Sequence, residues 1–129
     1  MNAESVTGMA RAIATRVTEA RSTGTPLRIV GAGLWLDAGR PTRASTTLDM
    51  PALAGADGGI SRYEPGDLTL TAGAATPLAV IERATSAEGQ WLPLQPFGSD
   101  GGTLGATIAT ASAGPLSSAY GTPREQMLR

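Results

Sequence analysis

LRIVGAGLWLDAG, residues 27–39, joins a short apolar run directly to a Gly-x-Gly turn. This order is typical of the start of a dinucleotide-binding Rossmann unit, in which the glycine turn holds a diphosphate. A Rossmann turn needs a third glycine and a helix after it, and both are missing here. Leu36 occupies the third glycine position, and residues 36–47, LDAGRPTRASTT, have no helical period. We therefore interpret the stretch as a strand followed by a glycine loop of another kind.

The composition of the chain leaves little acid–base chemistry to its side chains. Its 129 residues suffice for one small domain or for a piece of a larger one. The absence of histidine and cysteine excludes disulfides, thiolate or imidazole metal sites and histidine-dependent nucleophilic catalysis. The ten basic residues are all arginine, and with eleven acidic residues the net charge is −1, which provides no basic surface for nucleic acid. These exclusions favour a binding domain whose chemistry comes from a cofactor.

The N-terminal residues carry charges throughout and lack the continuous apolar core of a secretory signal. No window of the sequence approaches the roughly 20 apolar residues that a membrane-spanning helix needs. The sequence therefore predicts a cytoplasmic protein without a membrane span.

The first half of the chain predicts one long helix and two short strands. Apolar residues recur at steps of three and four over residues 4–23, which predicts an amphipathic helix that ends at Gly24. Residues 27–30 form the first expected strand. The segment TTLDM, residues 46–50, forms the second.

The middle of the chain predicts a hairpin. In ISRYEPGDLTLTAGA, residues 60–74, two strand-like runs flank Pro65 and Gly66, which suit the central positions of a type II turn. Leu68 and Leu70 alternate with threonines, as expected of the second strand.

A second helix is expected directly after the hairpin, over residues 77–88. Thr76 fits its N-cap, Pro77 its first position and Gly89 its end. Residues 90–96, QWLPLQP, then predict a further strand. Helices and short strands in this order predict an α+β fold.

A second glycine-rich region, FGSDGGTLGATIATASAGPLSSAYG, covers residues 97–121. Thr103 is expected to cap a short helix that runs to Ala111. The free N–H groups of its first turn would face the turn at residues 101–102, where an anion could bind. Two glycine loops suggest a diphosphate held between them. The alternative is that both are ordinary turns.

Four motifs in a fixed order resemble the FAD-binding domain of the vanillyl-alcohol oxidase and p-cresol methylhydroxylase type. They are LRIVGAG, ISRYEPGDLTLTAGAATPLAVIERA, GQWLPLQPFGSDGGTLGATIATASAGP and YGTPREQML. Within this family the likeness is strongest to the FAD-binding subunits of bacterial glycolate oxidases. The resemblance implies an α+β domain of two subdomains with FAD between them. Residues 1–24 would form an N-terminal helix, residues 25–97 the first subdomain and residues 98–129 the start of an incomplete second subdomain.

The resemblance also implies which residues contact FAD. The loop after the first strand would surround the diphosphate with backbone N–H groups, and the family's second glycine motif and its later Tyr-Gly pair would complete the site. The implied residues are Gly31, Ala32, Gly33, Leu34, Trp35, Gly102, Thr103, Leu104, Gly105, Ala106, Ala109, Thr110, Gly114 and Gly121.

Three positions depart from the family pattern. Ala106 replaces a usual glycine, Ala111 a frequent asparagine and Glu125 a usual aspartate. Many relatives attach the flavin through histidine or cysteine, and since this chain has neither, the resemblance implies noncovalent FAD.

Single residues outside the motifs have plainer interpretations. Trp35 either lies against the cofactor or folds over the core, and Trp91, next to leucines, is expected in the core. Alternation along the first strand places Arg28 toward solvent. Arg124 and Glu125 are expected to be structural.

The function implied by the resemblance is the FAD-binding portion of an oxidoreductase that oxidises a small 2-hydroxy acid, glycolate-like, with electrons leaving through other subunits of a glycolate-oxidase-like complex. No catalytic residue and no metal are assigned, and the fragment alone is expected to be inactive. One alternative is a noncatalytic scaffold subunit or truncated fragment of a flavoprotein complex. Another is a reductase of the cell-wall precursor pathway, which shares this type of FAD domain.

Overall fold

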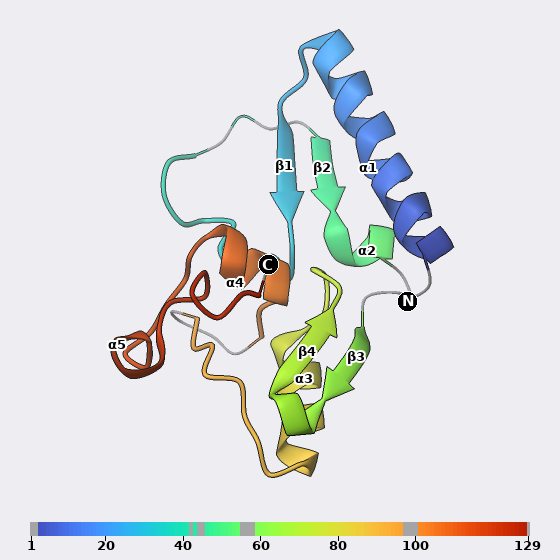
Figure 1. The fold of residues 1–129 in the computed structure, drawn as a ribbon. Helices are drawn as coiled ribbons and strands as arrows, with labels where there is room; N and C mark the ends of the chain where they lie inside the picture. The colour runs from blue at the N-terminus through green and yellow to red at the C-terminus, as the bar shows by residue number, and fades with distance from the viewer. Residues whose placement is uncertain (1–2, 42, 44–45, 55–58, 97–100, 129) are drawn as a thin grey trace.

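The fold of the chain, in a computed structural model that describes residues 3–41, 43, 46–54, 59–96 and 101–128, mixes helices with two small sheets. Figure 1 shows the order of the elements along the chain. They are α1 (Ala3–Thr23), β1 (Leu27–Val30), β2 (Thr46–Asp49), α2 (Met50–Ala54), β3 (Ile60–Glu64), the 3-10 turn η2 (Pro65–Asp67), β4 (Thr69–Ala72), α3 (Leu78–Ala87), α4 (Leu104–Ala109) and α5 (Ser117–Tyr120).

The parallel pair β1–β2 carries the glycine loop that decides the fold. Leu27 pairs with Thr46, and the register continues to Val30 opposite Asp49. Turns and irregular backbone, and no helix, follow β1 over residues 31–41, so the rejection of a Rossmann unit is confirmed. The second strand ends one residue earlier than predicted. Asp49 accepts a hydrogen bond from the Ala52 N–H at 2.9 Å and so starts α2.

Helix α1 confirms the long amphipathic helix predicted at the N-terminus. It ends where expected, because Gly24 adopts a left-handed conformation with φ of +64°. The Thr25 N–H then donates to the Ala20 carbonyl oxygen at 2.8 Å. In Figure 1 the helix lies beside β2 and α2.

The hairpin β3–β4 is antiparallel, as predicted, but the predicted type II turn is wrong. The chain makes the 3-10 turn η2, and Leu68, not Gly66, takes the left-handed conformation with φ of 54°. The Leu68 N–H donates to the Pro65 carbonyl oxygen at 3.2 Å, and the Leu68 side chain is 77% exposed. The turn is longer than a type II turn, so the strand begins only at Thr69.

The predicted N-cap of α3 is wrong by one residue. Pro77 is the N-cap, with extended φ and ψ, and Thr76 is buried before it. The Leu78 N–H donates to the Gly102 carbonyl oxygen at 3.0 Å. A segment distant in sequence therefore supplies the acceptor that the Thr76 side chain was expected to provide. The other end of the helix is as predicted, with Gly89 at φ of +67°.

Residues 90–96 do not form the predicted strand. Pro93 and Pro96 have no N–H to donate, and none of the described strands pairs with this segment. Trp91 is 52% exposed, so its predicted core position is also wrong. Its ring meets that of Tyr120 edge to face at a centroid distance of 5.1 Å.

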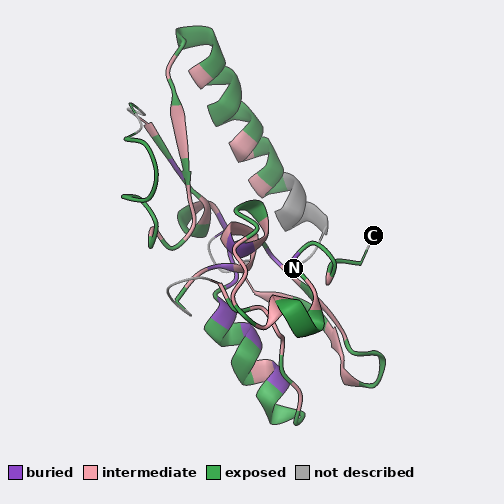
Figure 2. Ribbon diagram, turned by 90° about the vertical axis from the view of Figure 1, so that its left-hand side faces the viewer, coloured by how far each residue is buried: buried purple, intermediate pink, exposed green. Residues whose placement is uncertain are grey.

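The buried residues are mostly small and are rich in threonine. Figure 2 shows them along one side of α3 and where the chain crosses the centre of the molecule. They include Leu48, Ala54, Ala75, Leu78, Ile81, Thr76, Thr85, Thr103 and Thr107. The Thr85 hydroxyl donates to the Ile81 carbonyl oxygen, whereas the Thr76 hydroxyl has no hydrogen-bond partner within the described ranges.

Thr76→Val is expected to raise the free energy of unfolding by about 1 kcal/mol, because valine has the same shape and removes a buried hydroxyl that makes no hydrogen bond. Urea unfolding followed by circular dichroism measures the change. Thr85→Val is the matched control and should gain nothing, since it removes a hydroxyl that is bonded to a carbonyl oxygen. A Thr76→Val protein less stable than the wild type would contradict this account.

Candidate functional site

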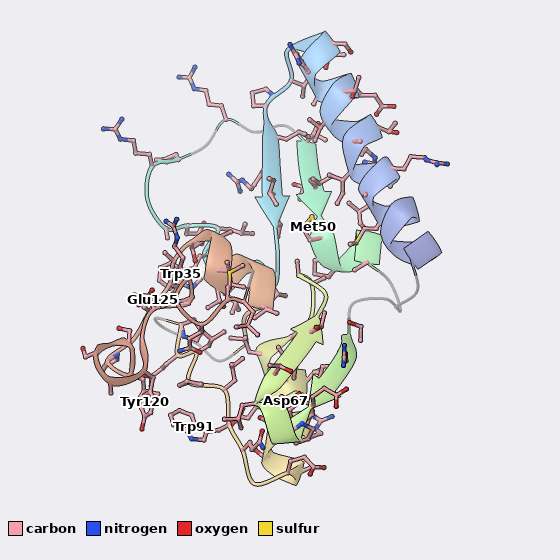
Figure 3. All side chains as sticks on the ribbon, viewed as in Figure 1. Trp35, Met50, Asp67, Trp91, Tyr120 and Glu125 are labelled. Atoms are coloured by element: carbon pink, nitrogen blue, oxygen red, sulfur yellow. The ribbon has the colours of Figure 1, made fainter. Side chains whose placement is uncertain are left out.

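One cavity of about 200 Å³ brings the two glycine-rich regions together. One wall comes from the end of β1 and the loop after it, and the other from the region around α4. Figure 3 shows Trp35 of the loop close to α4. The lining residues are Ile29, Val30, Gly31, Ala32, Gly33, Leu34, Trp35, Leu36, Pro96, Gly102, Ala106, Thr107, Thr110 and Ser112.

A close approach of Gly31 to Thr103 joins the two walls. A Cβ atom at Gly31 would lie 2.6 Å from Thr103 Oγ1 and 3.1 Å from the Ala106 side chain. Thr103 is held in place, because it is 3% exposed and its Oγ1 accepts the Ala106 N–H as the N-cap of α4. Only glycine fits at residue 31 without moving one wall.

Backbone hydrogen bonds to the segment before α3 anchor α4. The Leu104 N–H donates to the Thr76 carbonyl oxygen at 2.9 Å, and the Gly105 N–H donates to the Ala74 carbonyl oxygen at 2.7 Å. A Cβ atom at Gly105 would lie 2.8 Å from that carbonyl oxygen, so this glycine serves backbone packing.

These bonds overturn the prediction that the first turn of α4 offers free N–H groups to an anion. Thr103 caps the helix as predicted, but the N–H groups of Leu104, Gly105 and Ala106 already have acceptors within the protein. The helix also ends at Ala109, earlier than the predicted Ala111. Any anion held in the cavity must find its donors elsewhere.

The loop after β1 provides such donors. Within the described chain, the N–H groups of Ala32, Gly33 and Leu34 donate to no other group. Gly33 has φ of +75°, a left-handed conformation that favours glycine. These three N–H groups are therefore backbone donors that the loop leaves available at the cavity.

Not all of the sequence-predicted residues line the cavity. Gly31, Ala32, Gly33, Leu34, Trp35, Gly102, Ala106 and Thr110 do. Thr103 lies behind the wall as the helix cap, and Leu104 and Gly105 bond to the segment before α3. Ala109 is exposed, Gly114 packs against Gln95, and Gly121 lies beside Glu125.

Sequence reasoning missed several lining residues, namely Ile29, Val30, Leu36, Pro96, Thr107 and Ser112. Thr107 had a usable signal, since Thr103, Thr107 and Thr110 are spaced by four and three residues and share one helix face. Ile29 was missed because alternation along the strand placed it on the face away from Arg28, which was expected to be the buried one. Ile29 is 71% exposed at the cavity, and Arg28, expected in solvent, is half-buried.

Glu125 lies in a local turn with Thr122. The Thr122 N–H donates to Glu125 Oε2 at 2.7 Å and the Thr122 hydroxyl at 2.8 Å. These two hydrogen bonds, the backbone one first, hold the pKa of the carboxyl below its ordinary value of 4.5. The sequence TPRE, residues 122–125, is the pattern of a capping box, and this pattern could have predicted the turn.

The electrostatics of the cavity come from the backbone. None of the described residues that line it has an ionisable side chain. The described part of the chain also holds no group of three acidic residues suited to a metal ion. Across the same residues, every helix is too short or too polar to cross a lipid bilayer.

Comparisons with known proteins give a family match and a curated relative. Residues 8–129 match the model of a family described as FAD binding domain. The chain is 36% identical over 120 residues to the glycolate oxidase subunit GlcE of Escherichia coli (strain K12), a match that covers 92% of this chain and 33% of that protein. The chain thus spans about a third of the length of the curated relative. No solved structure matches it.

Ala111→Gly is expected to raise the free energy of unfolding by about 1 kcal/mol, because Ala111 has φ of 50° and glycine adopts that conformation without strain. Asparagine also tolerates this conformation. Thermal unfolding measures the effect. Ala109→Gly, within α4, is the control and should destabilise. Equal losses in both variants would contradict the left-handed assignment.

Acid is expected to loosen the turn at residues 122–126. Because the folded pKa of Glu125 is lowered, its stabilising hydrogen bonds are fully present above the ordinary value of 4.5 and are lost as pH falls through the lowered pKa. The chemical shift of the Thr122 amide proton should therefore titrate with a midpoint below 4.5. Glu125→Gln should abolish this titration. A midpoint at or above the ordinary value would disprove the contact.

Proposed function

Because this chain belongs to the family of FAD-binding domains, we propose that it is the FAD-binding portion of a flavin-dependent oxidoreductase that oxidises a glycolate-like 2-hydroxy acid. The observation that carries the proposal is the cavity whose walls come from both glycine-rich regions. The relative named as a glycolate oxidase subunit supports the substrate class.

The residues at the cavity fit a bound dinucleotide. The unpaired N–H groups of residues 32–34 would hold the diphosphate, and the contact between Gly31 and Thr103 would keep them facing α4. A cavity of about 200 Å³ accommodates only part of FAD, as expected if the cofactor extends beyond it. Because the chain has no histidine or cysteine, the FAD would be noncovalent.

The share of the chemistry that falls to this chain is binding and orientation. A bound flavin would supply the acceptor for the hydride of the substrate. The apolar side chains of Ile29, Leu34 and Leu36 would exclude water on one side of the site. The described lining residues provide no acid or base, so we assign no catalytic residue to the chain.

The wider setting follows from the relative. GlcE is named as a subunit, which supports an enzyme whose electrons leave through other subunits of a cytoplasmic complex. Residues 25–97 and the start of a second subdomain at residues 98–129 would form the two sides of the FAD site. The second candidate is a noncatalytic scaffold subunit of a flavoprotein complex, favoured by the lack of ionisable groups among the described lining residues.

Equilibrium dialysis of FAD against the 129-residue chain tests the proposal. Gly31→Ala should weaken binding about tenfold or more, because its Cβ would clash with Thr103 Oγ1 and separate the two walls. Gly66→Ala is the matched control, since a Cβ there meets nothing within 4 Å. All bound flavin should be released when the protein is unfolded.

Two results would count against the proposal. A folded wild-type chain that binds no FAD contradicts it, and if that chain joins other subunits of a complex, the scaffold function is favoured. Equal affinity of the Gly31→Ala and Gly66→Ala proteins would show that FAD binds away from the cavity.

A further inference from the structure

We propose that Trp35 is the ring-binding side chain of this cavity, with its indole stacked on a planar ring of the dinucleotide. The ring is either the isoalloxazine or the adenine, which share the flat aromatic surface that an indole recognises. This inference rests on the proposed function and adds to it a role for one side chain.

The apolar side of the cavity is concentrated around Trp35. The side chain of Trp35 is 47% exposed, and next to it Leu34 is 50% and Leu36 47% exposed. Ile29, from the end of β1, adds a fourth exposed apolar side chain to the same lining. Apolar side chains left exposed together around a cavity mark a ligand site, because burying them against a ligand gains free energy.

The side of the cavity formed by α4 is more polar, because it carries threonine hydroxyl groups. The Thr107 hydroxyl donates to the Thr103 carbonyl oxygen at 3.0 Å, and the Thr110 hydroxyl donates to the Ala106 carbonyl oxygen at 2.7 Å. Thr107 is buried, so the hydroxyl oxygen that the helix side offers to a ligand is that of Thr110, and because its proton is already used it acts as an acceptor. A nucleotide has the matching groups, with an apolar ring on one side and sugar or ribityl hydroxyl groups on the other.

The second tryptophan provides an internal comparison. Trp91 is 52% exposed, about as much as Trp35, but it lines a different groove, with Leu78 and Leu116. Its ring meets that of Tyr120, as Figure 3 shows. Exposure alone therefore does not distinguish the two indoles. The two indoles differ in position, because only Trp35 lines the cavity at the glycine loop.

Nuclear magnetic resonance of the indole N–H groups tests the contact directly. The chain has two tryptophans, so two indole signals are expected, and Trp35→Phe and Trp91→Phe assign them. Titration with FAD should shift the Trp35 signal and leave the Trp91 signal in place. Separate titrations with riboflavin and with ADP then distinguish isoalloxazine from adenine.

Affinity provides the second arm of the test. By equilibrium dialysis, Trp35→Ala should bind FAD about tenfold more weakly than the wild type, within the range that aromatic stacking contributes, and Trp35→Phe should recover most of the loss. Trp91→Ala should bind like the wild type. Should Trp35→Ala not fold, Trp35→Leu replaces it, since leucine keeps the apolar volume and removes the ring.

The outcomes separate this inference from the proposed function. FAD binding with an unshifted Trp35 signal, or with equal affinity for the wild type and the Trp35 variants, overturns the stacking role and leaves the FAD site intact. A wild-type chain that binds none of FAD, riboflavin or ADP overturns both.

Discussion

The contact between Gly31 and Thr103 is the constraint on which the site depends. Thr103 is fixed from two directions, since its side chain caps α4 and the carbonyl oxygens of Ala74 and Thr76 bond the first turn of that helix. The loop after β1 can approach this fixed point only because residue 31 has no side chain. The cavity is the space left between a loop and a helix that are held together at one point.

The two glycine-rich regions therefore contribute different groups to the cavity. The N–H groups in the first turn of α4 donate within the protein, so this region contributes shape, small side chains and the hydroxyl oxygen of Thr110. The loop after β1 leaves N–H groups unpaired and exposes an apolar surface that includes Trp35. A binding site with polarity from backbone and hydroxyl groups is consistent with a chain that lacks histidine and cysteine.

Several local signals in the sequence predicted the structure correctly, although the turn signal at Pro65 and Gly66 did not. Gly24 and Gly89 end α1 and α3, and Thr103 caps α4, because each of these features is decided by one residue and its nearest neighbours. Sequence reasoning failed where a distant segment decides. At the start of α3, the Gly102 carbonyl oxygen, and not the Thr76 side chain, accepts the Leu78 N–H. At the start of α4, the N–H groups that were expected to be free donate to the carbonyl oxygens of Ala74 and Thr76. The two glycine-rich motifs predicted the two walls of the cavity, but not the lining residues Ile29 and Thr107.

The central claim is that the N–H groups of residues 32–34, and not those at the start of α4, bind the diphosphate of FAD. Backbone amide chemical shifts during a titration with FAD measure this most directly. The account predicts large shifts for Ala32, Gly33 and Leu34 and small shifts for Leu104 and Gly105, whose N–H groups already donate within the protein. Large shifts at Leu104 and Gly105, with the loop signals unchanged, would contradict it.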